Sequence, residues 1–225
     1  MRIGLHGSGG RGDAAAPWSR LIPALGDGAE VVTVDGGARR DAILVIGGVA
    51  NAEGETIVAF ARGGGPVLGI GDGFQTLCGL ALLPGSATAP TGDDGHVHVH
   101  VRVEGRATPF TSAIPAGRVV RWNGASAVGL RYDIAEPDAL EARGQVIFRY
   151  CDAAGGLLSP ATANDQSQLR LSSVPLIPPR VSARAIAGVC SEAGNVVGVL
   201  TTAAAVGALA GQLLASLRLH LRGKR

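Results

Sequence analysis

The chain has 225 residues, enough for one large domain with a substantial core, and we predict a single domain over residues 1–225. Aromatic residues make up only 4% of it, so the core should consist mainly of Val, Leu, Ile and Ala. A net charge of +2 gives no argument for binding nucleic acid or a membrane surface. No apolar run is long enough to span a membrane, no signal-peptide pattern opens the chain, and the three cysteines form no disulfide framework, so we expect a cytoplasmic protein.

The first part of the chain alternates apolar strands with helices. The predicted strands are 1–6, 31–34, 42–46 and 66–70, and the predicted helices are 13–25, 56–62 and 73–82. Near-continuous apolar strands that alternate with helices are typical of a parallel sheet covered on both faces. We therefore predict an α/β fold with a mostly parallel sheet and helices on both faces.

After Pro90 the pattern changes, because residues 96–104 alternate His or Arg with Val, which indicates a half-buried strand. Further strands, antiparallel and at the sheet edge, are predicted at 118–122, 127–132 and 145–150, followed by a long loop or insertion at 157–179 and two last strands at 185–190 and 196–200. A closing helix from Ala203 places Val206, Leu209, Leu213 and Leu217 on one face. The basic end, residues 220–225, is expected to be a short disordered tail.

One segment, residues 69–85, joins an apolar strand to a helix through a turn flanked by glycines and reads GIGDGFQTLCGLALLPG. This is the layout of a nucleophile elbow, in which the central residue is held exposed at the top of a sheet. The central residue here is Gly71, which has no side chain to act as a nucleophile. The elbow and its pocket are predicted to comprise Gly69, Gly71, Asp72, Gly73, Phe74 and Gln75.

The elbow resembles that of the glutaminase subunit of phosphoribosylformylglycinamidine synthase, a class I glutamine amidotransferase, which reads roughly Gly-Ile-Cys-Asn-Gly-Phe-Gln-Ile-Leu-Cys. Residues 146–152 (VIFRYCD) and 186–198 (IAGVCSEAGNVVG) resemble two further motifs of the same family. The resemblance implies a flavodoxin-like domain. It also places the catalytic cysteine at Gly71, the histidine base at Thr202 and the orienting glutamate at Ala204. The glycine-rich oxyanion loop of the family corresponds to residues 47–53, where only its leading glycines, Gly47 and Gly48, remain.

Glutamine hydrolysis by such a triad needs a thiolate, an imidazole that takes its proton and a carboxylate that fixes the imidazole. Gly, Thr and Ala supply none of these groups. The resemblance therefore implies a catalytically vacant homologue without glutaminase activity or cofactor. It would act as a non-hydrolytic structural or regulatory subunit, in a specialised biosynthetic pathway, bound to a synthetase that resembles the large subunit of the same purine enzyme. In the active family ammonia made at the elbow passes to the synthetase, so the two proteins would dock near the elbow mouth.

Two alternatives stay open. One is an enzyme whose chemistry is rebuilt in the same cleft from Asp72, Thr202 or the histidine-containing strand 96–104. The other is a small-molecule binding protein that uses the vacated pocket, which the loss of three side chains enlarges.

Two further patterns resemble ligand sites. Residues 7–12 (GSGGRG), with Asp35 at the end of the second strand, fit the dinucleotide-binding glycine pattern, but a glycine-rich chain produces it easily and a turn without a nucleotide is favoured. His96, His98 and His100 share one face of one strand, where neighbouring imidazoles point in parallel rather than converging on an ion. We therefore predict no metal site.

The three cysteines, Cys78, Cys151 and Cys190, each fall where the family already has a cysteine distinct from the nucleophile. They are predicted to be buried structural thiols.

Overall fold

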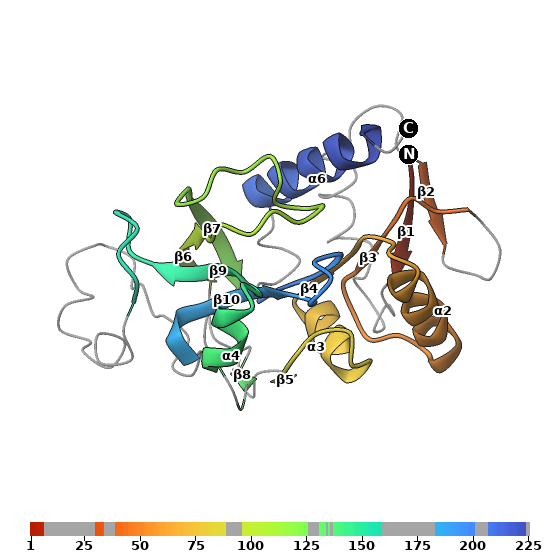
Figure 1. The fold of residues 1–225 in the computed structure, drawn as a ribbon, viewed down its shortest axis with the longest axis horizontal. Helices are drawn as coiled ribbons and strands as arrows, with labels where there is room; N and C mark the ends of the chain where they lie inside the picture. The colour runs from red at the N-terminus through yellow and green to blue at the C-terminus, as the bar shows by residue number, and fades with distance from the viewer. Residues whose placement is uncertain are drawn as a thin grey trace.

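The computed structural model describes residues 1–6, 30–33, 39–88, 96–125, 131–133, 135, 137–158, 183–200 and 207–223 (Figure 1). The strands are β1 (Arg2–His6), β2 (Glu30–Thr33), β3 (Ala42–Val45), β4 (Val67–Ile70), β5 (Ser86–Thr88), β6 (His96–Val103), β7 (Val119–Ala125), β8 (Arg131–Asp133), β9 (Val146–Cys151), β10 (Ile186–Cys190) and β11 (Val196–Val199). The helices are α2 (Asn51–Arg62), α3 (Asp72–Gly79), α4 (Pro137–Ala142), the short 3-10 helix η2 (Ala183–Ala185) and α6 (Gly207–Arg222). No helix in these ranges is both long and apolar enough to cross a membrane.

Nine strands form one sheet in the order β2-β1-β3-β4-β11-β10-β9-β6-β7. The neighbours from β2 to β11 run parallel, and those from β11 to β7 run antiparallel. Parallel neighbours need a crossover connection, and α2 provides it between β3 and β4. The predicted α/β fold is confirmed, and so are the antiparallel strands β6 and β7 at one end of the sheet.

Side chains of the central strands alternate between two cores, one on each face of the sheet. On β3, Ala42 and Leu44 belong to one core, whereas Ile43 and Val45 belong to the other. The first core is closed by α6 and the second by α2, α3 and α4. Figure 1 shows α6 above the sheet and α2 and α3 below it, so helices cover both faces as predicted.

The closing helix packs as its sequence predicts, because Leu209, Leu213 and Leu217 are each at most 1% exposed. Residues 203–206 lie outside the described part of the chain, and the helix runs from Gly207 to Arg222. Residues 220–222 of the expected disordered tail are instead the last residues of this helix, and residues 224 and 225 lie outside the described ranges.

Helix α2 begins at Asn51, five residues before the predicted start at Thr56. The carboxylate of Glu53 accepts a hydrogen bond from the backbone N–H of Ala50 at 3.0 Å, which stabilises the first turn. Gly54 lowers the helical propensity of this segment, but it packs under Leu80, whose Cδ2 would lie 3.0 Å from a Cβ at this position. Tertiary packing therefore extends the helix beyond what its local sequence favours.

In the second half of the chain one prediction needs correction and one helix was missed. The strand predicted at 127–132 does not join the edge of the main sheet: its described end belongs to β8, which pairs with β5 in a separate two-stranded sheet. Helix α4 was not predicted. The predicted helix 13–25 and most of the predicted loop 157–179 lie outside the described residues.

Candidate functional site

The turn between β4 and α3 has the backbone geometry of a nucleophile elbow. Its central residue, Gly71, has φ 60° and ψ −117°, a conformation that residues with a Cβ rarely adopt. The N–H of Gly71 donates to the carbonyl of Val199 at 3.1 Å, and its own carbonyl accepts from the N–H of Phe74 at 2.9 Å. The turn is therefore fixed both to the end of β11 and to the first turn of α3.

The glycines on either side of this turn allow the helix to approach the sheet closely. A Cβ on Gly69 would lie 2.5 Å from Cδ1 of Leu77 and 2.8 Å from the carbonyl oxygen of Gly73. A Cβ on Gly73 would lie 1.9 Å from the carbonyl oxygen of Val45. These positions exclude a side chain through packing, whereas Gly71 excludes one through its backbone conformation.

The carboxyl ends of three parallel strands, β3, β4 and β11, meet at this edge of the sheet. The residues after β3 are Ile46, Gly47 and Gly48, and the hydroxyl of Thr76 on α3 donates to the carbonyl of Gly47 at 2.9 Å. This hydrogen bond ties the predicted oxyanion loop to the elbow helix. The segment after β11 continues toward residues 202 and 204, both of which lie outside the described part of the chain.

The remaining predicted pocket residues differ in what they contribute. Asp72 is exposed, and Gln75 is half-buried. Phe74 is 0% exposed and packs against β11, where a Cβ on Gly198 would lie 1.8 Å from its ring. Phe74 therefore anchors α3 to the sheet, and among the described elbow residues only Asp72 carries an ionisable side chain.

The three native cysteines are held as protonated thiols. Burial raises the pKa of the Cys78 thiol to about 12, and its Sγ lies 3.8 Å from the carbonyl oxygen of Pro84. Burial, followed by the nearby Asp152 carboxylate, raises the pKa of Cys151 to about 11. Burial also raises the pKa of Cys190. These directions agree with the prediction of structural thiols, because the thiolate is the nucleophilic form.

The Arg-Tyr-Cys-Asp strand, residues 149–152, has structural roles in this fold. Arg149 is 8% exposed, and its Nη2 pairs with Oε1 of Glu141 on α4 at 2.8 Å. Its Nη1 donates to the carbonyl of Arg184 at 2.6 Å, while Nη1 of Arg184 pairs with Oε2 of Glu141 at 3.0 Å. The hydrogen bond from Arg149 lowers the pKa of Glu141, with Arg184 acting in the same direction. Arg149 thus joins β9 to α4 and η2.

The neighbouring residues of the same strand fix two further segments. The hydroxyl of buried Tyr150 donates to the carbonyl of Leu200 at 3.0 Å. Leu200 stands two residues before Thr202, the position that the family resemblance assigns to the histidine base. Oδ1 of Asp152 accepts from the N–H groups of Ala154 and Gly156, each at 2.8 Å, and closes the turn after β9.

The second family motif, residues 186–198, also holds the scaffold together. The side-chain amide of Asn195 donates to the carbonyls of Ala61 and Gly65 at 2.8 and 3.0 Å, so it pairs carbonyls at the C-terminal end of α2. Gly194 has φ +77°, which lets the turn between β10 and β11 close. This motif therefore positions the strand that leads to the site.

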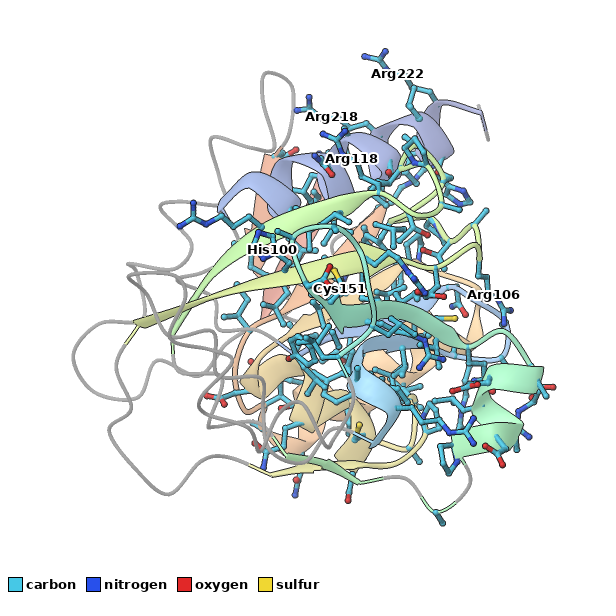
Figure 2. The ribbon with its side chains drawn as sticks, turned by 90° about the vertical axis from the view of Figure 1, so that its left-hand side faces the viewer. His100, Arg106, Arg118, Cys151, Arg218 and Arg222 are labelled. Carbon is cyan, nitrogen blue, oxygen red and sulfur yellow. The ribbon has the colours of Figure 1, made fainter. Side chains whose placement is uncertain are left out.

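The expectation that neither glycine pattern nor histidine strand forms a ligand site remains a prediction. Residues 7–12 and Asp35 lie outside the described part of the chain. Among the side chains that the structure describes, no three His, Cys, Asp or Glu residues could hold a metal ion; those of His96 and His98 are outside this set. His100 pairs with Cys151 across β6 and β9, and both are labelled in Figure 2.

No family model matches the chain, but curated relatives do. It is 35% identical over 181 residues to the phosphoribosylformylglycinamidine synthase subunit PurQ of Rhodopseudomonas palustris, a match that covers 78% of this chain and 70% of the relative. It is 37% identical over 193 residues to PurQ of Thermomicrobium roseum, covering 78% and 75% of the two chains. The chain belongs to the PurQ family.

Solved structures show the same fold. A chain in the structure of PurLQS from Thermotoga maritima superposes with a TM-score of 0.67 at 22% identity, covering 98% of both chains. The glutaminase domain of Trypanosoma brucei CTPS gives a TM-score of 0.56 at 11% identity, covering 100% of this chain and 94% of that one. The resemblance to class I glutamine amidotransferases is thus confirmed for family and fold.

Sequence reasoning missed two residues that hold the site, Thr76 and Tyr150. Thr76 stands in the helix directly after the elbow, five residues beyond Gly71, and this position is the available signal that it faces the neighbouring loop. The hydroxyl of Tyr150 meets a carbonyl 50 residues away, and no local pattern reveals such a contact.

Proposed function

We propose that this PurQ-family chain is catalytically vacant and acts as a non-hydrolytic structural or regulatory subunit of a synthetase complex. The observation that carries the proposal is Gly71 at the centre of the elbow, where the family resemblance places the catalytic cysteine. The other two roles fall by resemblance on Thr202 and Ala204, which offer neither an imidazole nor a carboxylate. Without a thiolate and its base, the elbow cannot form the covalent intermediate of glutamine hydrolysis.

The scaffold around the vacant position supports a role in assembly. Gly69 and Gly73 still allow the close approach of α3 to the sheet, and Thr76 still holds the loop at Gly47. Asn195 and Tyr150 still fix the strands that meet at this edge. Features that shape a surface are thus present, whereas the groups that would perform the reaction are not.

The relatives are named as subunits of a synthase, and the structure with the same fold is named PurLQS. We propose a partner of the corresponding kind, a large synthetase subunit, docked near the mouth of the elbow in the cytoplasm. The vacant chain would stabilise or regulate a synthetase that uses free ammonia or another amine. It needs no cofactor for this role.

Two measurements test the proposal. The first is ammonia release from glutamine by the chain alone and mixed with a large synthetase subunit from the same organism, with an active PurQ pair as the positive control. We expect no release above background. Hydrolysis that requires this chain would overturn the vacancy.

The second measurement is co-expression of the two proteins followed by size-exclusion chromatography. We expect them to elute together at micromolar concentration. Separate elution would contradict the role as a subunit and favour the two alternatives that use the cleft for other chemistry or for a ligand.

A further inference from the structure

A cavity of about 690 Å³ lies at the edge of the sheet opposite the elbow. It is bordered by the residues before β4 and β11, whereas Gly71 follows the end of β4. Its walls also come from the turn after α3, from the segment after β6 and from the last turn of α6. Its volume falls within the range of small-molecule sites, about 300–1,000 Å³. Nothing in the proposed function uses this cavity.

One wall carries a guanidinium whose position is fixed. Arg106 Nη1 donates to the carbonyl of Arg143 at 3.0 Å, and Nη2 donates to the carbonyl of Glu192. Both acceptors are neutral, so these bonds orient the guanidinium without neutralising its charge. Gly194 packs beside it, since a Cβ there would lie 3.4 Å from Nη2, an ordinary van der Waals contact.

A second arginine lines the same cavity from the end of α2. Arg62 is exposed, and its side chain makes no hydrogen bond or ion pair with any residue that the structure describes. The carbonyls of Ala61 and Gly65 beside it are already paired with the amide of Asn195. The carbonyl dipoles at this helix end are thus partly satisfied, which weakens the negative potential that would otherwise attract Arg62.

Two of the segments that contribute to the cavity walls are basic. Residues 96–125 and 207–225 together contain eight arginine and lysine residues and a single carboxylate, although the whole chain is nearly balanced at 20 against 18. In Figure 2, Arg218 and Arg222 project from α6 and Arg118 is drawn near it, whereas Arg106 lies apart from them at the edge of the fold. Such a distribution raises the local concentration of anions and steers them toward a cavity with cationic walls.

The cavity also contains one carboxylate, that of exposed Glu192, and the imidazole of His220. Two arginine cations therefore oppose a single carboxylate, with the imidazole as an additional hydrogen-bonding group. Ser112 and Ser191 add hydroxyl groups to the lining. Guanidinium groups match carboxylate and phosphate oxygens in geometry as well as in charge.

We propose that this cavity is a binding site for a small anionic metabolite that carries a phosphate or carboxylate group, held by Arg62 and Arg106. The site stands apart from the elbow, so the proposal holds whether or not the elbow is vacant. The proposed ligand of this cavity is therefore different from glutamine, the substrate of the elbow in active relatives.

Isothermal titration of the full-length chain tests the proposal with inorganic phosphate, ribose 5-phosphate and citrate as probes and ribose as the neutral control. We expect at least one anion to bind with a dissociation constant below 1 mM and ribose not to bind. Comparison of ribose 5-phosphate with citrate distinguishes a phosphate ligand from a carboxylate ligand. Failure of all three anions to bind at 10 mM would overturn the site.

Three variants locate the bound anion. Arg62 is exposed, so Arg62→Gln should fold normally and weaken anion binding at least tenfold. Glu192→Gln removes the opposing negative charge and should strengthen anion binding. Arg121→Gln makes the same charge change as Arg62→Gln at an exposed position of β7 that does not line the cavity, and it should leave binding within twofold. Equal weakening by Arg62→Gln and Arg121→Gln would show general electrostatic attraction and contradict a defined site. Arg106→Gln is a fourth variant that should also weaken binding; if it fails to fold, the Arg62 and Glu192 variants still decide the question.

Discussion

A Cβ atom on Gly73 would lie 1.9 Å from the carbonyl oxygen of Val45. The backbone of Gly73 therefore lies directly against the end of β3. This close packing of the first turn of α3 fixes the elbow relative to the loop at Gly47. The close approach needs glycine at this position, because a Cβ would overlap the backbone of β3. The same backbone packing therefore supports the elbow whether or not a nucleophile stands at its centre.

Gly73→Ala should destabilise the fold by about 3 kcal/mol, the upper end of the usual overpacking cost, because backbone rather than a flexible side chain blocks the new methyl group. Urea unfolding followed by circular dichroism measures the change. Gly79→Ala in the same helix is the matched control, since a Cβ there meets nothing within 4 Å. Equal stabilities of the two variants would show that α3 does not lie this close to β3.

Asn195→Ala should lower the free energy of unfolding by about 1–3 kcal/mol, because the carbonyls of Ala61 and Gly65 both lose their side-chain donor. Asn51→Ala replaces an exposed asparagine at the start of α2 and should change the stability by less than about 0.5 kcal/mol. Thermal and urea unfolding of both variants test this. An Asn195→Ala variant as stable as the Asn51→Ala variant would remove the structural explanation of this family motif.

The Glu141 carboxylate should make stability depend on pH in the acid range. Hydrogen bonds from Arg149 and then Arg184 hold its pKa below the ordinary value of 4.5, to which it returns on unfolding. The unfolded chain therefore binds more protons in the window below 4.5, and the stabilisation is fully present above that pH and lost as pH falls through the folded pKa.

Urea unfolding from pH 3.5 to 7 should show wild type more stable than Glu141→Gln by a constant amount above about pH 5.5, one unit or more over the ordinary pKa. The difference should shrink below pH 4.5. Glu55→Gln removes an exposed carboxylate that forms no ion pair with any described residue, so it serves as the control. A difference that stays constant down to pH 3.5 would contradict this role of Glu141.

The part of the site that could be predicted from sequence is the part that depends on local geometry. The apolar run before Gly69 and the glycines at 69, 71 and 73 specify a strand, a tight turn and a helix within a few residues. Buried positions on α6 follow from helical periodicity in the same way. These features need no knowledge of distant segments.

Features formed by distant segments could not be predicted. Helix α4 has only six residues, too few for a periodic pattern, and it is stabilised by burial of Leu140 and by ion pairs from Glu141 to Arg149 and Arg184. Strand β8 depends on β5, which lies more than 40 residues earlier. The cavity with Arg62 and Arg106 is lined by residues of several separate segments, so no single sequence motif predicts it.

The native thiols should be unreactive. With the pKa of Cys78 raised to about 12, only about one thiol in 10,000 is ionised at pH 8, and Cys151 and Cys190 are shifted in the same direction by burial. Reaction with Ellman's reagent at pH 8 should release no thionitrobenzoate within minutes from the native chain and three equivalents in denaturant. One fast-reacting thiol in the native chain would contradict this prediction and support a native cysteine as a substitute nucleophile.

Gly71→Cys should lower stability by about 1–3 kcal/mol, because φ 60° and ψ −117° suit glycine and strain any residue with a Cβ. The matched control is Gly79→Cys, which introduces the same side chain in α3 where the backbone φ is not positive and no atom lies within 4 Å of the new Cβ. The control should keep a melting temperature close to that of wild type. A Gly71→Cys variant that melts as high as Gly79→Cys would show that residue 71 does not have the elbow conformation in solution.

The same variant tests whether a thiol alone restores chemistry. Members of a catalytic triad act as a unit, and loss of one nucleophile or base in a serine protease costs about as much as loss of all three, roughly a million-fold. Gly71→Cys should therefore release no ammonia from glutamine while residues 202 and 204 remain Thr and Ala. Addition of Thr202→His and Ala204→Glu to Gly71→Cys supplies the base and its orienting carboxylate, so only the triple variant can gain activity. Hydrolysis by the single variant would mean that a base other than residue 202 faces the elbow, and the assignment of the vacant positions would then be wrong.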